Sequence, residues 1–190
     1  MPIVVTNPLP FATPADLDAW LQTHHATATE LWVRVFKKDA AIASVTWNDM
    51  VIAALTWGWI DGQRQSLDDV SFVQRMTPRR PRSMWSKKNC EHAERLIAEG
   101  RMQPSGLAQV QAARDNGRWD TAYAGTADMV MPAELLDAVN ANPAAAAAFA
   151  TLDRAQRFAI YHRLQTALKP ATRAKHIRDF IEKLAPNTPR

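Results

Sequence analysis

The sequence predicts an α+β fold, with a mixed N-terminal part that holds a small antiparallel sheet and two or three helices, followed by an all-helical C-terminal part. The run Leu31–Phe36 alternates β-branched and aromatic residues as a strand does. The stretch from Trp59 to Thr77 indicates a β-hairpin that turns at residues 67–69. No segment beyond Pro81 has the pattern of a strand. Strands and helices that are segregated along the chain are typical of the α+β class.

The composition is typical of a folded globular protein and excludes several other classes. With 190 residues, 47% of them hydrophobic and 22% charged, the chain suits one domain, or one domain with a helical appendage, and can bury a sizeable core. No apolar run approaches the ~20 residues that span a bilayer, and the first residues lack the basic start of a signal peptide. The single cysteine, Cys90, excludes an internal disulfide and a cysteine-rich metal site. We therefore expect a folded cytoplasmic protein.

Local signals place the elements of the N-terminal part. Residues 3–6 predict a short strand, and a loop with several prolines follows it. Thr13 and Thr46 each precede a helical pattern with a carboxylate in its first turn, so both are expected to be helix N-caps. Gly58 is expected to end the second helix, because glycine readily adopts the left-handed conformation found after helix ends.

Helix signals follow one another in the C-terminal part. The residues expected at helix starts are Ser86, Pro104, Pro132, Pro143 and Thr151. The last helix is expected over residues 171–184, where apolar side chains fall at helical spacing. We expect an α+β domain over residues 1–103 and a helical region over residues 104–190, with the two packed together as one unit.

The net charge of +4 is distributed in blocks. Residues 64–88 and 154–190 are basic, whereas residues 1–63 and 89–153 are acidic. The blocks can pair internally, or the basic ones can gather on one face. The cations of the last block are expected on the solvated faces of two helices, with docking on the acidic block or on an acidic partner as the alternative.

The arginine-rich segment from Arg79 to Arg82 is the strongest candidate for a binding site. It precedes Trp85 and a predicted helix start, and guanidinium groups beside a helix N-terminus suit phosphate or carboxylate. The alternative is that these arginines form ordinary ion pairs with carboxylates, namely Asp61, Asp68, Asp69 or the acidic block that follows. The neighbouring tryptophans allow stacking on nucleic-acid bases, but residues of this size are more often part of a core.

Catalytic and metal-binding signals are weak. Asp61 is expected to be a counter-ion of Arg75 or Arg79 rather than a proton shuttle. Cys90 is expected to be a small buried hydrophobe, and the basic Lys87 and Lys88 keep a reactive thiolate as the alternative. The five histidines show no metal-ligand spacing, so neither a metal nor a cofactor is expected.

Seven motifs resemble, in order, those of the bacterial YdeI/OmpD-associated proteins, from about residue 30 to residue 184. They are Leu31-Trp32-Val33, Gly58-Trp59-Ile60-Asp61-Gly62, the run Gln74 to Pro81, Trp85-Ser86, the run Arg95 to Met102, the run Gly117 to Tyr123, and Lys169-Pro170-Ala171-Thr172-Arg173. The resemblance implies a bacterial stress or protection protein, in a family named for its association with an outer-membrane porin and for protection against bacteriocins and cationic antimicrobial peptides. It implies no catalytic activity or cofactor.

The resulting hypothesis is a non-enzymatic cytoplasmic protein that binds an anionic small molecule or an acidic protein surface. The expected ligand-binding residues are Trp59, Asp61, Arg75, Arg79, Arg80, Arg82, Trp85, Ser86 and Arg173. Two alternatives stay open. One is a nucleic-acid-binding module, whose affinity would fall steeply with salt. The other is an enzyme that uses Asp61 or Cys90 in an exposed cleft.

Overall fold

The structure, a computed structural model, describes residues 5–185. Within this range the chain forms eight α-helices and one four-stranded sheet, which confirms the predicted α+β class. The chain divides into two compact units. The first contains the residues up to Ser83 together with Asn89–Trp119, and the second contains Met84–Lys88 and the residues from Asp120 onward. No helix in the described range is both long and apolar enough to cross a membrane.

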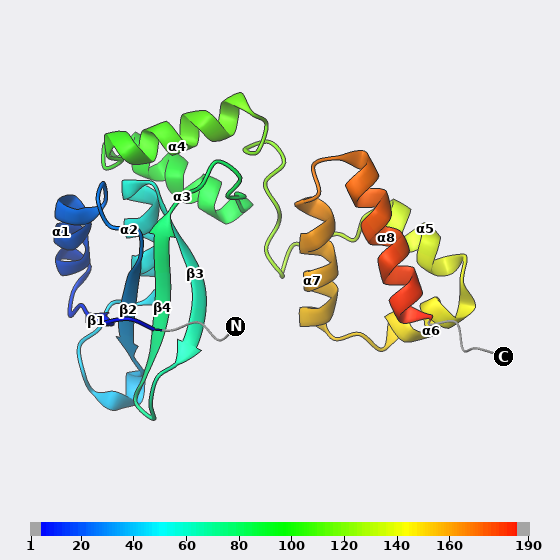
Figure 1. The fold of residues 1–190 in the computed structure, drawn as a ribbon, viewed down its shortest axis with the longest axis horizontal. Helices are drawn as coiled ribbons and strands as arrows, with labels where there is room; N and C mark the ends of the chain where they lie inside the picture. The colour runs from blue at the N-terminus through cyan, green and yellow to red at the C-terminus, as the bar shows by residue number, and fades with distance from the viewer. Residues whose placement is uncertain (1–4, 186–190) are drawn as a thin grey trace. The chain divides into compact units, whose positions relative to one another are not determined.

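The sheet belongs to the first unit and is mixed (Figure 1). Its strands are β1 (Leu9–Pro10), β2 (Leu31–Phe36), β3 (Trp59–Ser66) and β4 (Ser71–Pro78). In the order β1-β2-β4-β3, β1 runs parallel to β2 and the other pairs are antiparallel. The predicted hairpin is therefore present as β3 and β4, with a register shift between Asp61 and Arg64.

The first strand differs from the prediction. Of the strand expected over residues 3–6, the first two residues lie outside the described part of the chain, and Val5 and Thr6 are not in a strand. Instead, Leu9–Pro10 within the expected loop pairs with β2, with Leu9 opposite Val33. A pair this short depends on the partner strand, so the local sequence carries little sign of it.

Helices α1 (Pro14–His24) and α2 (Trp47–Trp57) pack against one face of the sheet (Figure 1). Both begin with the capping box expected at Thr13 and Thr46. Leu17 of α1 is fully buried in the same cluster as Val33 of β2. A one-turn 3-10 helix, Lys38–Ala40, lies between β2 and α2.

Helices α3 (Lys87–Ala98) and α4 (Pro104–Asp115) follow the hairpin. The C-terminal end of α2 and the start of α4 approach closely: Ser105 donates a hydrogen bond from its hydroxyl to Trp57 O at 3.0 Å, and the backbone N–H of Gln103 donates to Thr56 O at 3.1 Å. Helix α4 therefore packs within the first unit, although it lies beyond the boundary expected at residue 103.

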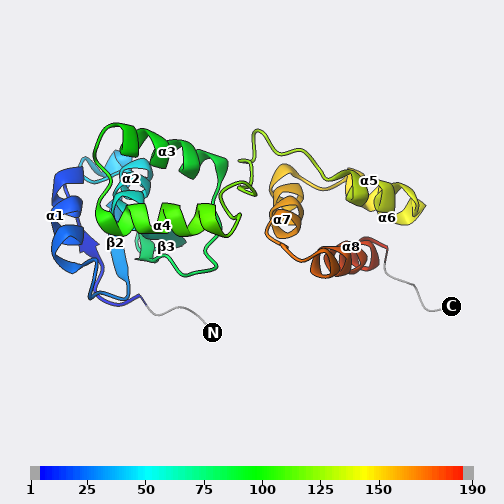
Figure 2. The same cartoon turned by 90° about the horizontal axis from the view of Figure 1, so that it is seen from above.

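The second unit is built from four helices (Figure 2). They are α5 (Ala133–Asn140), α6 (Pro143–Ala150), α7 (Arg154–Gln165) and α8 (Pro170–Leu184). Their buried cluster includes Leu135 and Leu164, both fully buried. The expected N-cap at Thr151 is wrong: α7 is capped by Asp153, which forms a capping box with Gln156, while Thr151 follows the end of α6.

Candidate functional site

The structure brings Trp59 and Arg79 together inside the first unit. Trp59 is 1% exposed and donates from Nε1 to His25 O at 3.2 Å. Arg79 is 6% exposed and donates from Nε to Trp59 O at 3.2 Å. Both side chains are therefore part of the packed interior. The core interpretation of the tryptophans predicted this for Trp59, whereas Arg79 was expected in an arginine-rich binding patch.

Arg75 and Asp61 do not pair, so the predicted counter-ion role of Asp61 toward Arg75 is wrong. Asp61 lies opposite Met76 in the hairpin, and neighbouring residues of a strand point to opposite faces, so Arg75 faces away from Asp61. Asp61 accepts a hydrogen bond from Trp47 Nε1 at 3.1 Å. Arg75 instead pairs with Glu30, with 2.7 Å between Nη2 and Oε2.

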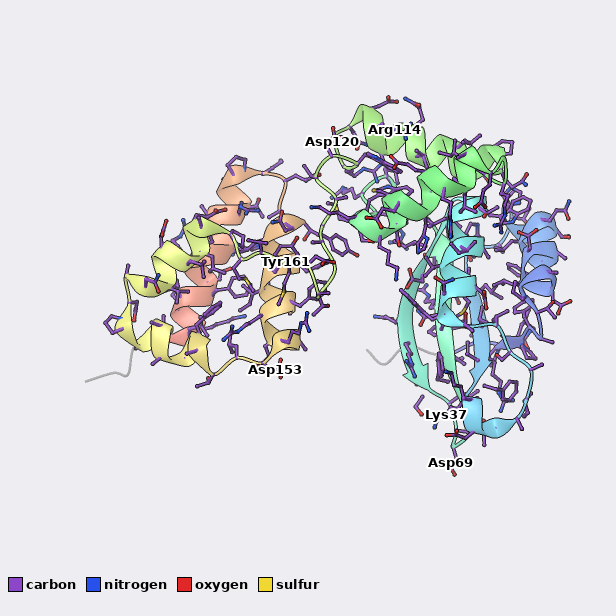
Figure 3. All side chains as sticks on the ribbon, turned by 180° about the vertical axis from the view of Figure 1, so that it is seen from behind. Lys37, Asp69, Arg114, Asp120, Asp153 and Tyr161 are labelled. Atoms are coloured by element: carbon purple, nitrogen blue, oxygen red, sulfur yellow. The ribbon has the colours of Figure 1, made fainter. Side chains whose placement is uncertain are left out.

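Asp68 and Asp69 of the hairpin turn also have partners other than the expected arginines. Asp68 pairs with Arg34 at 2.6 Å, and the backbone carbonyl of Asp69 accepts from Lys37 Nζ at 2.8 Å. Lys37 and Asp69 lie at the same end of the sheet (Figure 3). The carboxylate of Asp68, expected to neutralise the arginines after Thr77, is thus paired with a cation of β2, whereas the bond from Lys37 goes to the backbone of Asp69.

A short turn, residues 80–83, which we call the arginine turn, presents Arg80 and Arg82. Ser83 closes it, because its hydroxyl accepts from the N–H of Arg80 at 3.0 Å and its own N–H donates to Arg80 O at 2.9 Å. Arg118, 4% exposed, anchors the turn by donating from Nη1 to Ser83 O at 2.6 Å. Asn116 accepts from Arg118 Nε at 2.8 Å and so fixes this arginine.

Arg80 and Arg82 are both exposed, and neither has a carboxylate within 4.0 Å among residues 5–185. A backbone held by hydrogen bonds thus carries two guanidinium groups into solvent. Arg118 was not among the expected site residues. It lies in the 117–123 motif, which was the only sequence signal for it.

The remaining expected residues belong to the second unit. Trp85 is 1% exposed, and Ser86 forms an isolated parallel bridge with Tyr123. Arg173 on α8 donates from Nε to Glu134 Oε1 at 2.5 Å and from Nη1 to Leu164 O at 2.6 Å. The pKa of Glu134 is lowered, first by its own backbone N–H and then by Arg173.

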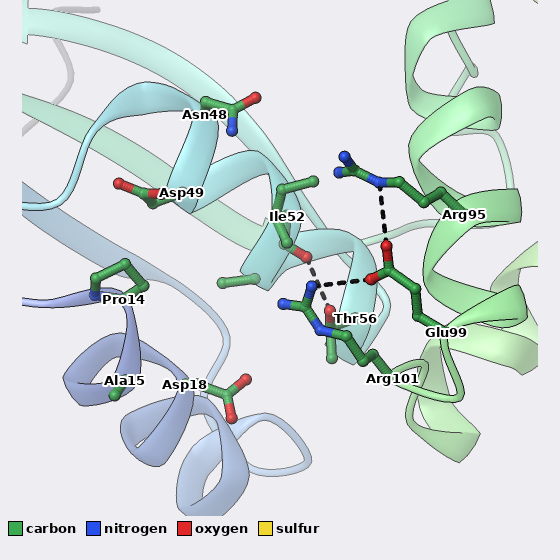
Figure 4. Close-up of a pocket in the computed structure, with 11 residues that line it drawn as sticks. Pro14, Ala15, Asp18, Asn48, Asp49, Ile52, Thr56, Arg95, Glu99 and Arg101 are labelled. Carbon is green, nitrogen blue, oxygen red and sulfur yellow. Dashed lines mark hydrogen bonds and ion pairs between the residues drawn. The ribbon is translucent and has the colours of Figure 1, made fainter.

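A polar cleft of about 490 Å³ lies in the first unit between α1, α2 and the end of α3 (Figure 4). The two arginines of its lining pair with one carboxylate: Glu99 lies 3.0 Å from Arg101 and 3.8 Å from Arg95. Asp18 accepts a hydrogen bond from Trp57 Nε1 at 2.7 Å. The cations of the cleft are thus already engaged by Glu99.

Cys90 lies on α3 and is 8% exposed. Burial raises the pKa of its thiol to about 11, and Glu94 adds to the effect. A thiol with this pKa is protonated at neutral pH, whereas a nucleophile or a metal ligand needs the thiolate. The expectation of a buried cysteine is confirmed. Residues 5–185 contain no group of three or more histidine, cysteine or acidic side chains placed to hold a metal ion.

Comparisons with known protein families divide the chain in two. Residues 9–109 match the family described as Domain of unknown function (DUF8412), and residues 128–187 match the family described as Bacteriocin-protection, YdeI or OmpD-Associated. No curated protein and no solved structure matches the chain significantly. The motifs between residues 31 and 102 thus lie in the part with its own family model. The resemblance expected from about residue 30 to residue 184 is thus found over residues 128–187, which contain the motif Lys169-Pro170-Ala171-Thr172-Arg173 and are similar to the YdeI/OmpD-associated family. Through residues 9–109 the chain belongs to the DUF8412 family.

Proposed function

We propose that this member of the bacteriocin-protection type is a non-enzymatic binding protein that docks on an acidic protein surface through Arg80 and Arg82. The observation that carries the proposal is the arginine turn itself. Two exposed guanidinium groups stand on a turn fixed by Ser83 and Arg118, and no described carboxylate neutralises them. Fixing the backbone beforehand lowers the entropy that a partner would otherwise have to remove.

An acidic protein surface suits this turn better than an enclosed small molecule. Arginine forms two parallel hydrogen bonds with a carboxylate, and exposed charges speed the encounter of complementary surfaces. Of the other expected arginines, Arg79 is buried and Arg75 is paired with Glu30, so neither adds a free guanidinium group to the patch. The proposed binding surface therefore contains fewer arginines than the sequence analysis expected.

The test uses a fluorescent poly-L-glutamate peptide as the acidic probe, with binding followed by anisotropy at low salt. The double variant R80A/R82A is compared with R178A/K183A, which removes the same charge from exposed positions of α8. We expect the turn variant to bind roughly fivefold more weakly than the wild type, as for two exposed charge contacts. The control variant should bind nearly as the wild type does.

Equal weakening in both double variants would contradict the proposal, because only the net charge would then matter.

A fluorescent duplex DNA, titrated under the same conditions as the peptide, tests the nucleic-acid alternative. If DNA binds more tightly than the peptide and with a steep salt dependence, the chain binds phosphate groups in preference to carboxylates. The thiol-enzyme alternative has no support in the site, since burial keeps Cys90 protonated.

A further inference from the structure

A second cavity, of about 530 Å³, lies wholly within residues of the second unit. It is lined by the first residue of α3, by the loop after Trp119, and by the end of α7 and the start of α8. The residues that matter for its chemistry are Lys87, Asp120, Tyr161, Leu168, Pro170 and Arg173. Three motifs that are remote in sequence, around residues 87, 120 and 170, thus meet at one cavity.

Arg173 is held in a fixed position at this cavity. Its Nε donates to Glu134 Oε1 and its Nη1 to Leu164 O, which leaves Nη2 without a partner among the described residues. The side chain is 25% exposed. A guanidinium group has more N–H donors than these two bonds use, so donors remain for a ligand.

Lys87 supplies a second cation. Its backbone N–H donates to Tyr123 O at 2.9 Å, and the N–H of Tyr123 donates to Trp85 O at 3.1 Å, so the main chain at Lys87 is held against the 120s loop. Its ammonium group has no carboxylate within 4.0 Å in the described part of the chain. The one carboxylate in the lining is Asp120, and Glu134 outside the lining pairs with Arg173, so Lys87 is the lining cation that has no carboxylate partner in the described range.

Tyr161 contributes a buried hydrogen-bond donor. The side chain projects from α7 (Figure 3), and the residue is 4% exposed. Its hydroxyl oxygen accepts from the N–H of Ala124 at 2.9 Å, and no acceptor for the hydroxyl hydrogen lies among residues 5–185. The hydroxyl hydrogen is therefore left to donate, and an anion in the cavity would give it an acceptor.

The rest of the lining combines two polar residues, Thr121 and Gln165, with apolar ones. Leu168 is a large hydrophobic residue that is 56% exposed at the cavity, and Pro170 lies two residues further on. Ligand sites commonly combine apolar walls with a few fixed polar groups. The N–H donors of Lys87 and Arg173 beside an uncovered leucine favour a ligand with one anionic group and an apolar body.

We propose that this cavity binds a small organic anion. Arg173, Lys87 and the Tyr161 hydroxyl hold the charged group, and the apolar body covers Leu168 and Pro170. The anionic group is a carboxylate or a phosphate ester, since both accept hydrogen bonds from these donors. The site is independent of the arginine turn, because Arg80 and Arg82 do not line it.

The test titrates the full chain with hexanoate, hexyl phosphate and hexylamine while NMR follows the Arg173 Nε–H and Gln165 side-chain signals. We expect both anions to shift these signals saturably and hexylamine to leave them unchanged. Whichever anion binds more tightly identifies the charged group. Saturable binding of hexylamine at the same residues, or no shift with either anion, would overturn the proposal.

Two surface variants locate the site without disturbing the core. L168D places a second carboxylate at the cavity and should weaken anion binding roughly tenfold or more. V130D is the control, because Val130 is 76% exposed in the same unit and does not line the cavity. Equal affinity in L168D and V130D would refute the assignment. R80A/R82A should bind hexanoate as the wild type does, so a failure of the arginine turn leaves this result unaffected.

Discussion

At the scale of the residue, Cys90 is the side chain whose chemistry is best defined. Burial raises the pKa of its thiol from 9.0 to about 11, so the folded state favours the protonated form. Its contribution to stability is complete below pH 9 and is lost as the pH rises through about 11. A buried thiol of this kind also reacts slowly with electrophiles.

We expect Cys90 in the folded chain to react with iodoacetamide at about pH 8 at roughly one hundredth of the rate in denaturant, because two pKa units change the thiolate fraction about a hundredfold. The difference between the two rates should become smaller as the pH approaches 11. Mass spectrometry of quenched samples measures both rates. Similar rates in the folded and denatured chain would mean that the thiol is exposed and acidic.

For single residues, burial could be predicted from the sequence, whereas ion-pair partners could not. The burial of Trp59 and Trp85 could be predicted, because large aromatic side chains offer much area to bury. The partners of Arg75 could not, since Glu30 lies 45 positions away and is brought to it by strand pairing. Charge pairing across a sheet depends on register, and register is not visible in the segment that contains the arginine.

At the scale of the element, the contact between α2 and α4 is close enough for a single substitution at Gly106 to probe. A Cβ at Gly106 would lie 2.7 Å from Leu55 O and closer still to Thr56 O. These are backbone atoms at the end of α2, so a side chain can fit only if the two helices move apart. Overpacking of this kind typically costs about 1–3 kcal/mol.

We therefore expect G106A to lower the free energy of unfolding by about 1–3 kcal/mol, although alanine favours helices over glycine. The measurement is chemical denaturation followed by tryptophan fluorescence. G62A is the matched control, because a Cβ there would lie 3.5 Å from Arg75 O, at an ordinary contact distance. If G106A proves as stable as G62A, the helices are not held at this separation.

Helix ends show how far local signals reach. Thr13, Thr46 and Gly58 were predicted correctly, because capping uses residues within one turn. Two candidate N-caps, Thr151 and Asp153, lie two residues apart before α7. Asp153 is the N-cap in the structure, because Gln156 completes its capping box. Strand β1 had no such signal, since its two residues are ordered only by their partner.

At the scale of the whole molecule, the chain passes between the two units more than once. Residues 84–88 belong to the second unit, the stretch 89–119 returns to the first, and the chain then continues in the second. The boundary expected at residue 103 would separate α4 from α2. The structure joins these two helices by the hydrogen bond from Ser105 to Trp57 O. The units therefore differ from the ranges that composition suggested, because contacts rather than sequence order define them.

We expect the separate fragments 1–103 and 104–190 to be less folded than the intact chain. The first loses α4, and the second loses the backbone hydrogen bonds that join Trp85 and Lys87 to Tyr123. Far-UV circular dichroism of each fragment, summed and compared with the intact protein, measures the loss of helix. A sum equal to the intact spectrum would instead support independent folding on either side of residue 103.

The segment 84–88 has a consequence for synthesis on the ribosome. It emerges before the rest of its unit, and its backbone partner Tyr123 follows only after a loop of about 35 residues has been made. Closing a flexible loop of that length costs about 3 kcal/mol, but a first unit that has already folded over residues 89–119 shortens the free chain. We expect the nascent chain to complete its sheet and α4 first, with Trp85 docking last.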